Sequence, residues 1–323
     1  MTTLSHPITT PSTSRTLFQK LWQINWPLAG LGFISLALMG LAAIGLAIDP
    51  RVITGAPAWV KPLKFAISTV FYAFTLVWML GYVKNHPRLV STIGAMTAVA
   101  LVIELALIVL QVTRGVRSHF NFTTPLDGAL FSAMGTLIIV VWVMNLLAAL
   151  LIMRQSFTDS AFAWSLRLGL LITLVGAGVA FLMTQPTPAQ MAEMQAGNMP
   201  VEIGAHSIGV ADGGPSLPFV GWSTEGGDLR VAHFVGLHGL QVLPLAGWVI
   251  NRLYGAKLSQ RRRAALVWTA GLGYLGFTLS LAWQALRGQS VIAPDALTLA
   301  AFGGLAAVAL VVSAFIALPA RKA

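Results

Sequence analysis

Residues 91–112 read STIGAMTAVALVIELALIVLQV, and Glu104 is the one charged residue in this apolar run. An α-helix needs about 20 apolar residues to cross the hydrocarbon core of a bilayer. The run is therefore long enough to span a membrane. Because an ionisable side chain inside a membrane is costly and marks a functional site by default, we expect Glu104 to face protein rather than lipid.

The same pattern occurs seven more times, which predicts eight membrane-spanning segments. Backbone groups in lipid must be satisfied internally, so each run of this length is expected to be an α-helix. The predicted fold class is an all-α, polytopic integral membrane protein. Residues 1–21 are an N-terminal tail, and residues 22–323 are a single bundle of eight transmembrane helices. Besides residues 91–112, the spans are residues 26–48, 65–83, 129–153, 162–184, 231–250, 264–284 and 297–318.

Composition excludes several classes of protein. Charged residues are 9% of the 323 residues, whereas soluble domains carry about a quarter, so there is no room for a sizeable soluble domain. The net charge is +10, but the basic residues are spread among short loops, as topology signals are, and we exclude nucleic acid as a partner. The chain has no cysteine, which excludes disulfides, thiolate metal sites, iron–sulfur clusters and c-type haem.

The distribution of charge predicts the orientation, because Lys and Arg collect in cytoplasmic loops. With the N-terminus in the cytoplasm, 13 of the 20 basic residues lie on the cytoplasmic side, including Arg261, Arg262 and Arg263, and eight of the ten acidic residues lie opposite. We predict a multi-pass protein of the inner (cell) membrane with both termini cytoplasmic. The longest connection, residues 185–228, is then extracytoplasmic, and loops of this length often serve as lids or binding loops.

Two spans carry most of the polar side chains near the extracytoplasmic surface. At about 100° per residue, one narrow face of the third span carries Glu104, Gln111 and Arg114. An arc of roughly 140° on the sixth span carries Arg230, His233, His238 and Gln241. Glu104 and His238 lie at about the same depth. We therefore expect these two faces to meet in a pocket that opens to the extracytoplasmic side.

This predicted pocket supplies candidates for three chemical roles. The candidate catalytic residues are Glu104, Asp228, Gln111 and Gln241. Imidazoles and carboxylates suit zinc or another divalent metal, and the candidate metal ligands are His119, His233, His238 and Glu104. Guanidinium groups suit haem propionates or other anions, so the candidate cofactor-binding residues are the same three histidines with Arg114, Arg117 and Arg230.

Two lysines, Lys61 and Lys64, lie in the segment GAPAWVKPLK, residues 55–64. They have two interpretations. They can join the arginines around an anion, or they can be lipid-facing lysines whose ammonium groups reach the membrane surface. The second interpretation is the one that the sequence favours.

The leading functional hypothesis is a pocket that binds one haem b or one divalent metal ion for redox chemistry on a small or lipid-soluble substrate. His119 and His233 match best in depth as axial ligands. The alternative is a cofactor-free protein that uses the same residues for proton-coupled transport or for lipid binding. A metal-dependent membrane lipid hydrolase is a further alternative, although no HExxH or GxSxG motif occurs. Membrane lipids are the predicted partners, and the sequence leaves open whether the protein is an enzyme.

Overall fold

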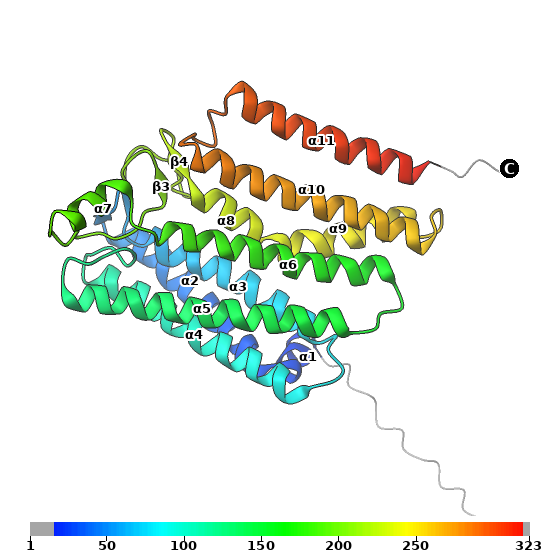
Figure 1. Cartoon of the computed structure of the whole chain (residues 1–323). Helices are drawn as coiled ribbons and strands as arrows, with labels where there is room; N and C mark the ends of the chain where they lie inside the picture. The colour runs from blue at the N-terminus through cyan, green and yellow to red at the C-terminus, as the bar shows by residue number, and fades with distance from the viewer. Residues whose placement is uncertain (1–15, 319–323) are drawn as a thin grey trace, which may run out of the picture.

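The computed structural model describes residues 16–318, and nearly all of its regular structure is helical (Figure 1). Seven helices are long and apolar enough to cross a membrane, and two shorter ones, α8 (Leu229–Leu237) and α9 (Gly239–Tyr254), pass the same test together. The prediction of an all-α, polytopic membrane bundle is confirmed. The seven helices are α2 (Trp26–Ile48), α3 (Val60–Leu80), α4 (Pro87–Thr113), α5 (Pro125–Arg154), α6 (Ser160–Met183), α10 (Gln260–Leu286) and α11 (Ala296–Ala317).

The sixth predicted span, residues 231–250, is not one continuous helix. Its two parts, α8 and α9, meet at His238 with a bend of 47°. Pro244 lies inside α9 and lacks the backbone N–H of a helical residue, which weakens the helix just before it. Gly236 of α8 packs so closely on Gly176 of α6 that a Cβ atom would lie 2.4 Å from the Gly176 Cα. The break therefore permits a close α8–α6 contact and leaves His238 at an exposed corner.

The starts of the helices follow local sequence signals. The side chains of Asn25, Thr124, Asp159 and Ser259 each accept a hydrogen bond from a backbone N–H three residues on, which satisfies donors that a helix start leaves free. Asn25 also donates to the carbonyl of Val90 at 2.9 Å and so joins α2 to α4. The same residue that starts α2 therefore sets its height against α4.

The two ends of the molecule differ (Figure 1). We call the end with residues 49–59, 114–124, 184–228 and 287–295 the loop end, and the end with Thr16 and Leu318 the terminal end. The terminal end carries α1 (Leu17–Ile24), which overlaps the predicted N-terminal tail; residues 1–15 of that tail lie outside the described residues. The loop end carries α7 (Pro188–Gln195) and the antiparallel pairs β1 (Val52–Ile53) with β2 (Ala56–Pro57) and β3 (Ser207–Ile208) with β4 (Gly227–Asp228).

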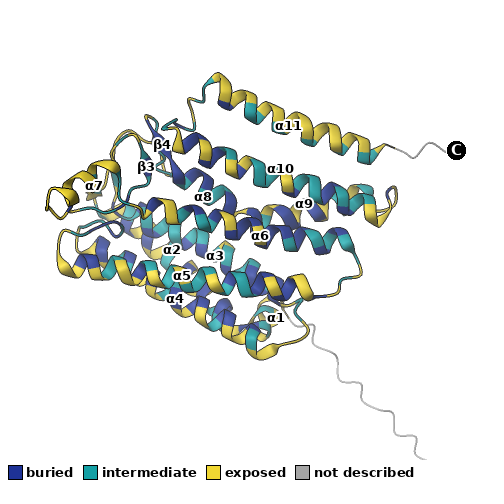
Figure 2. Ribbon diagram, in the orientation of Figure 1, coloured by how far each residue is buried: buried dark blue, intermediate teal, exposed yellow. Residues whose placement is uncertain are grey.

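The helices pack in two groups. Helices α2, α3, α4 and α5 form one group, and α6, α8, α9 and α10 form the other, with α5 against α6 and α3 against α9 between them. Helix α11 packs on α10 at the edge, and most of its apolar surface is exposed (Figures 1 and 2). An apolar helix surface of this kind is expected to face lipid.

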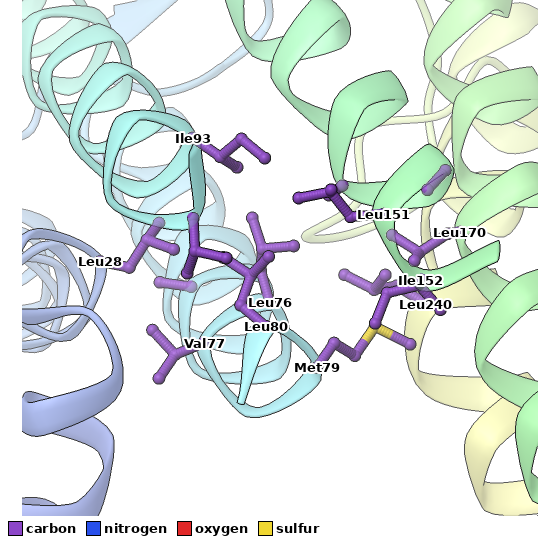
Figure 3. Close-up of a cluster of buried hydrophobic side chains, with 14 of the residues drawn as sticks. Leu28, Leu76, Val77, Met79, Leu80, Ile93, Leu151, Ile152, Leu170 and Leu240 are labelled. Atoms are coloured by element: carbon purple, nitrogen blue, oxygen red, sulfur yellow. The ribbon is translucent and has the colours of Figure 1, made fainter. Parts of the chain in front are cut away.

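Apolar side chains fill the centre and the terminal half of the bundle (Figure 3). The members shown come from six helices and interdigitate without a charged residue among them: Leu28, Leu76, Val77, Met79, Leu80, Ile93, Leu151, Ile152, Leu170 and Leu240. We call this set the apolar cluster. Because it closes the terminal half, the polar side chains that can do chemistry lie nearer the loop end.

Candidate functional site

Residues 184–228, the long loop, lie over the loop end and are held to the helices by hydrogen bonds. Lys64 of α3 donates to the carbonyl of Val220 at 2.9 Å, and Arg230 of α8 donates to the carbonyl of Gly221. Near its other end, Ser207 and Ile208 pair with Asp228 and Gly227 in the β3–β4 ladder. The long loop therefore covers polar side chains of the bundle rather than extending away from them.

Beneath this cover, Glu104 of α4 faces a histidine from the neighbouring loop. The Glu104 Oε1 atom lies 3.8 Å from His119 Nε2, and the Glu104 side chain is 2% exposed. The second carboxyl oxygen, Oε2, is buried and has no hydrogen-bond partner among the described residues. Glu104 therefore faces protein, as its position in an apolar span requires.

His119 lies in an aromatic environment made by Phe65, Phe120 and Phe131, whose ring centres are 5.8, 6.2 and 6.0 Å away. Its Nδ1 atom is 3.1 Å from Ser118 Oγ. Burial lowers the pKa of His119 well below its usual value, and the positive charge of Lys61 adds to this effect. A buried imidazole with few charged partners is disfavoured in its protonated form, so His119 is neutral at pH 7.

A second histidine at the site, His206, comes from the long loop and is paired with a carboxylate. Its Nδ1–H donates to Asp212 Oδ2 at 2.7 Å. The backbone N–H groups of His206 and Ser207 also donate to Asp212, at 3.0 and 2.9 Å. Burial opposes ionisation of Asp212, but the hydrogen bonds from His206 and Ser207 hold its pKa below the usual range. The pair is thus a neutral imidazole held in one tautomer by a carboxylate.

Burial lowers the pKa of His206, although the hydrogen bond that His206 donates to Asp212 acts in the opposite direction and raises it. The positive charges of Arg230 and Lys61 lower it further. The sequence placed His206 in the long loop but did not name it or Asp212 as site residues. They are six residues apart in a loop rich in Gly, Pro and Ser, and no periodic pattern marks such a pair.

Lys61 lies near the centre of these groups, at the second residue of α3. It interacts electrostatically with Glu104, His119 and His206, and its Nζ lies 5.9 Å from the centre of the Phe65 ring. Among residues 16–318 it makes no ion pair with a carboxylate within 4.0 Å. Lys61 is half-buried, and its charge interacts with these polar groups, so the structure favours the interpretation in which Lys61 lies beside an anion site.

His233 of α8 lies at the edge of the same region. Its Nδ1–H donates to the carbonyl of Gly176 at 2.8 Å, which leaves Nε2 as the acceptor nitrogen. It is close enough to His206 for an electrostatic interaction. We define the loop-end cluster as Lys61, Glu104, His119, His206, Asp212 and His233.

Several predicted site residues instead hold helices and loops together. Gln111 donates to Asp127 at 3.0 Å, and Arg114 pairs with the same carboxylate at 2.6 Å, so both tie the end of α4 to the start of α5. The other two predicted anion-binding arginines are also neutralised, Arg117 by Glu202 and Arg230 by Asp228. Asp228 in addition caps the start of α8, because it accepts from the Arg230 backbone N–H at 3.0 Å. These arginines therefore carry no free charge for a propionate.

His238 and Gln241 lie apart from Glu104. His238 Nδ1 is 3.4 Å from Gln241 Oε1, and Gln241 Nε2 is 3.2 Å from Thr75 Oγ1 of α3. Helix α4 packs on α2, α3 and α5, whereas α8 and α9 pack mainly on α6 and α10. The expected pairing of Glu104 with His238 therefore does not form, because a helical wheel gives the face of a helix but not its neighbour.

The geometry gives no support to a metal centre. Within the part of the chain that the structure describes, no group of three or more His, Cys, Asp or Glu side chains could hold a metal ion. An open groove of about 480 Å³ runs along the surface of α2 and α4, but its lining is almost wholly apolar and includes no histidine. The aromatic rings around His119 occupy the space beside that imidazole.

Comparison with known proteins gives no family for this chain. No protein-family model matches it, and no match is found among curated proteins or among solved structures. The chain is a multi-pass membrane protein by its helices, and what it does has to be inferred from the side chains of the loop-end cluster.

Proposed function

We propose that this protein is a cofactor-free membrane protein that binds an anionic lipid headgroup, or a small anion of the same chemistry, at the loop-end cluster. The protein lies in the inner membrane. Its loop end faces away from the cytoplasm, and both termini lie in the cytoplasm. The distribution of Lys and Arg supports this orientation, because the run Arg261–Arg263 and most other basic residues lie at the terminal end.

The observation that carries the proposal is the position of Lys61. Lys61 is half-buried and has no carboxylate partner within 4.0 Å among residues 16–318, whereas Arg114, Arg117 and Arg230 are each neutralised by a carboxylate. The side chain of Trp59 does not cap the start of α3, so no capping side chain offsets the positive end of the helix dipole there. A lysine at such a helix start is a suitable site for phosphate or carboxylate.

The remaining cluster residues supply protonatable groups around that site. Glu104 is buried with one oxygen free of partners, and His206 is held by Asp212 with its Nε2 as an acceptor. A carboxyl group and a neutral imidazole near a bound anion can give or take a proton as the anion binds. The ligand enters and leaves at the loop end, because the apolar cluster closes the other half of the bundle.

Native mass spectrometry of the delipidated protein tests the proposal. The wild-type protein is expected to retain phosphatidylglycerol in preference to phosphatidylcholine, and Lys61→Met to bind phosphatidylglycerol about tenfold more weakly, which corresponds to about 1.4 kcal/mol. Lys84→Met, at the terminal end, is the matched control and should bind as the wild type does. Soluble glycerol phosphate that competes would identify a small anion as the ligand. Equal binding by both variants would refute the role of Lys61.

A single haem or metal ion at His119 and His233 stays a prediction of the sequence. In its favour, the Nδ1–H of His233 is fixed by a carbonyl, as in many metal-binding histidines. Elemental analysis and a visible spectrum of the purified protein decide the matter. Stoichiometric iron with a Soret band that His233→Ala abolishes would replace the cofactor-free proposal.

A further inference from the structure

The open groove along α2 and α4 lies apart from the loop-end cluster. Helix α2 contributes Ile34, Leu38 and Leu41 to its lining, and helix α4 contributes a stripe of side chains that runs from Val102 to Thr113. The residues of the loop-end cluster are not part of this lining. Ile34 and Leu41 are exposed, so the groove is open on the side of the bundle that faces lipid.

The length and the chemistry of the groove match one lipid chain. Thr113 follows Val102 by 11 positions on α4, which is about 16 Å at 1.5 Å per residue. Thr113 is the last residue of α4, at the loop end, so the groove extends from the surface to about the middle of a hydrocarbon core that is about 30 Å thick. The Thr113 hydroxyl is satisfied, because it donates to the carbonyl of Leu110 at 2.7 Å. An acyl chain in the groove therefore packs against apolar side chains over the depth of one leaflet.

A guanidinium group lies at the loop end of the groove. Arg51, in the segment that follows α2, donates from Nη1 to the carbonyl of Thr113 at 3.3 Å. It also donates to Asp49 from Nε at 2.9 Å and from Nη2 at 2.7 Å. The indole nitrogen of Trp59 donates to the same carboxylate at 2.8 Å. Arg51 thus joins the end of α2 to the end of α4 and is held at the head of the groove.

Arg51 keeps hydrogen-bond donors for a ligand. A guanidinium group has five N–H donors. The contacts with Asp49 and Thr113 use the Nε–H and one N–H on each terminal nitrogen, so each terminal nitrogen keeps a second N–H. The Arg51 side chain is 44% exposed, and guanidinium donors bind phosphate oxygens well. Since Asp49 balances the charge of Arg51, this contact should not distinguish anionic from zwitterionic phospholipids.

We propose that the groove holds one acyl chain of a phospholipid from the leaflet at the loop end, with the phosphate of that lipid bound by Arg51. Contacts at both the chain and the phosphate slow the exchange of this lipid with the bilayer. Helix α11 also presents apolar side chains to lipid and is the comparison, because lipid there is expected to exchange freely. The proposal does not depend on Lys61, which is assigned to an anionic headgroup in the proposed function.

Photo-cross-linking of the full-length protein in phosphatidylcholine vesicles tests the chain site. The vesicles contain phosphatidylcholine with a diazirine in the middle of one acyl chain, and mass spectrometry of peptides locates the cross-links. The yield on α2 and α4 is expected to exceed the yield on α11 several-fold. Ala106→Trp fills the groove from an exposed position of its lining and should abolish this excess. Ala306→Trp, at an exposed position of α11, is the matched control and should preserve it.

Arg51→Gln tests the phosphate contact and should lower the yield in the groove several-fold. Its matched control is Arg287→Gln, because Arg287 is also paired with an aspartate at the loop end, Asp295 at 2.6 Å, beside α11; this variant should cross-link as the wild type does. If Ala106→Trp does not fold, Leu41→Trp fills the same groove. Equal yields on α11 and in the groove would overturn the proposal and indicate ordinary surrounding lipid. An unchanged yield in Arg51→Gln would overturn the role of Arg51, and Lys61→Met should not affect either result.

Discussion

The loop end and the terminal half of this protein are held together by different interactions. Of the six ion pairs between arginine and a carboxylate among residues 16–318, five lie at the loop end, and the pair of Arg263 with Asp159 is the one at the terminal end. The terminal half instead contains the apolar cluster. The loop end also has a smaller apolar core around Phe120, Met183 and Leu229, but it adds most of the ion pairs to that packing. The terminal half depends mainly on the fit of apolar side chains.

The terminal half thus supplies a stable frame, and the loop end carries the side chains that can bind a ligand. Lipid tails are as apolar as leucine, so the apolar cluster is stabilised mainly by close packing. Charged groups at the loop end are partly shielded from water by the long loop, and each must be paired or else available to a ligand. Most are paired. Lys61 and Glu104 make no ion pair with a charged group within 4.0 Å among residues 16–318, and their charges interact with each other.

The largest effect is expected from removing a paired carboxylate at the loop end. Asp228 has a fully buried side chain and holds Arg230 and the Ser223 backbone N–H. Asp228→Ala leaves the guanidinium partly buried and unpaired, and we expect a loss of about 3–5 kcal/mol in the free energy of unfolding. Thermal unfolding in detergent, followed by circular dichroism, measures this loss. Asp228→Asn keeps some of the hydrogen bonds and should lose less; a loss below about 1 kcal/mol in Asp228→Ala would mean that solvent screens the pair.

A smaller effect is expected from the apolar cluster. Leu76 is fully buried in it, and Leu76→Ala leaves a cavity that is expected to cost about 2–4 kcal/mol of stability. Leu310 of α11 is 70% exposed, so Leu310→Ala is the control and should change stability by less than about 0.5 kcal/mol. The same unfolding assay compares the two variants. Similar losses in both would contradict the assignment of α11 to the lipid-facing edge.

The fold was largely predictable because its signals are local. Apolar runs of about 20 residues gave the helices, and residues such as Asn25 and Thr124 mark where helices begin. The break at His238 was missed, although Pro244 and two glycines were visible in the sequence. A run that is apolar throughout predicts a crossing of the membrane, but it does not reveal a bend within that crossing.

The site was predictable only in part, because it depends on which segments become neighbours. Glu104 and His119 were both candidates, and the structure brings them together. His206 and Asp212 were not candidates, since a loop without periodicity gives no sign of where its side chains fold. His238 was placed by its helix face and its depth, and neither of these shows which helix lies next to it.

Acid should weaken the loop end through two buried histidines. Burial lowers the pKa of both His119 and His206 in the folded protein below the ordinary value of 6.5, so the unfolded chain binds more protons below that pH. Their contribution is complete above about pH 6.5 and is lost as the pH falls, by at most about 1.4 kcal/mol per pH unit for each histidine. Folding lowers the pKa of Asp212, so its contribution to stability is lost only below its ordinary pKa of 3.8, outside this pH range. The free energy of unfolding, measured from pH 7 to pH 5, should therefore decline, and His119→Phe should reduce the decline. An unchanged slope would show that folding does not lower the pKa of His119.

The smallest effect on stability is expected at Glu104, and it sharpens the comparison between two buried carboxylates at the same end. Asp228 accepts hydrogen bonds on both oxygens, whereas Glu104 Oε2 accepts none. When a carboxylate with many hydrogen bonds is removed, the N–H groups that donated to it are left unsatisfied. Glu104 accepts few hydrogen bonds, so replacing it by an uncharged amide leaves few such groups unsatisfied. Glu104→Gln should therefore change the free energy of unfolding by less than about 1 kcal/mol, or even stabilise the protein, and still alter how phosphatidylglycerol binding depends on pH. A loss as large as that of Asp228→Ala would instead show that Glu104 is a structural partner of His119 and has no role as a free proton-carrying group.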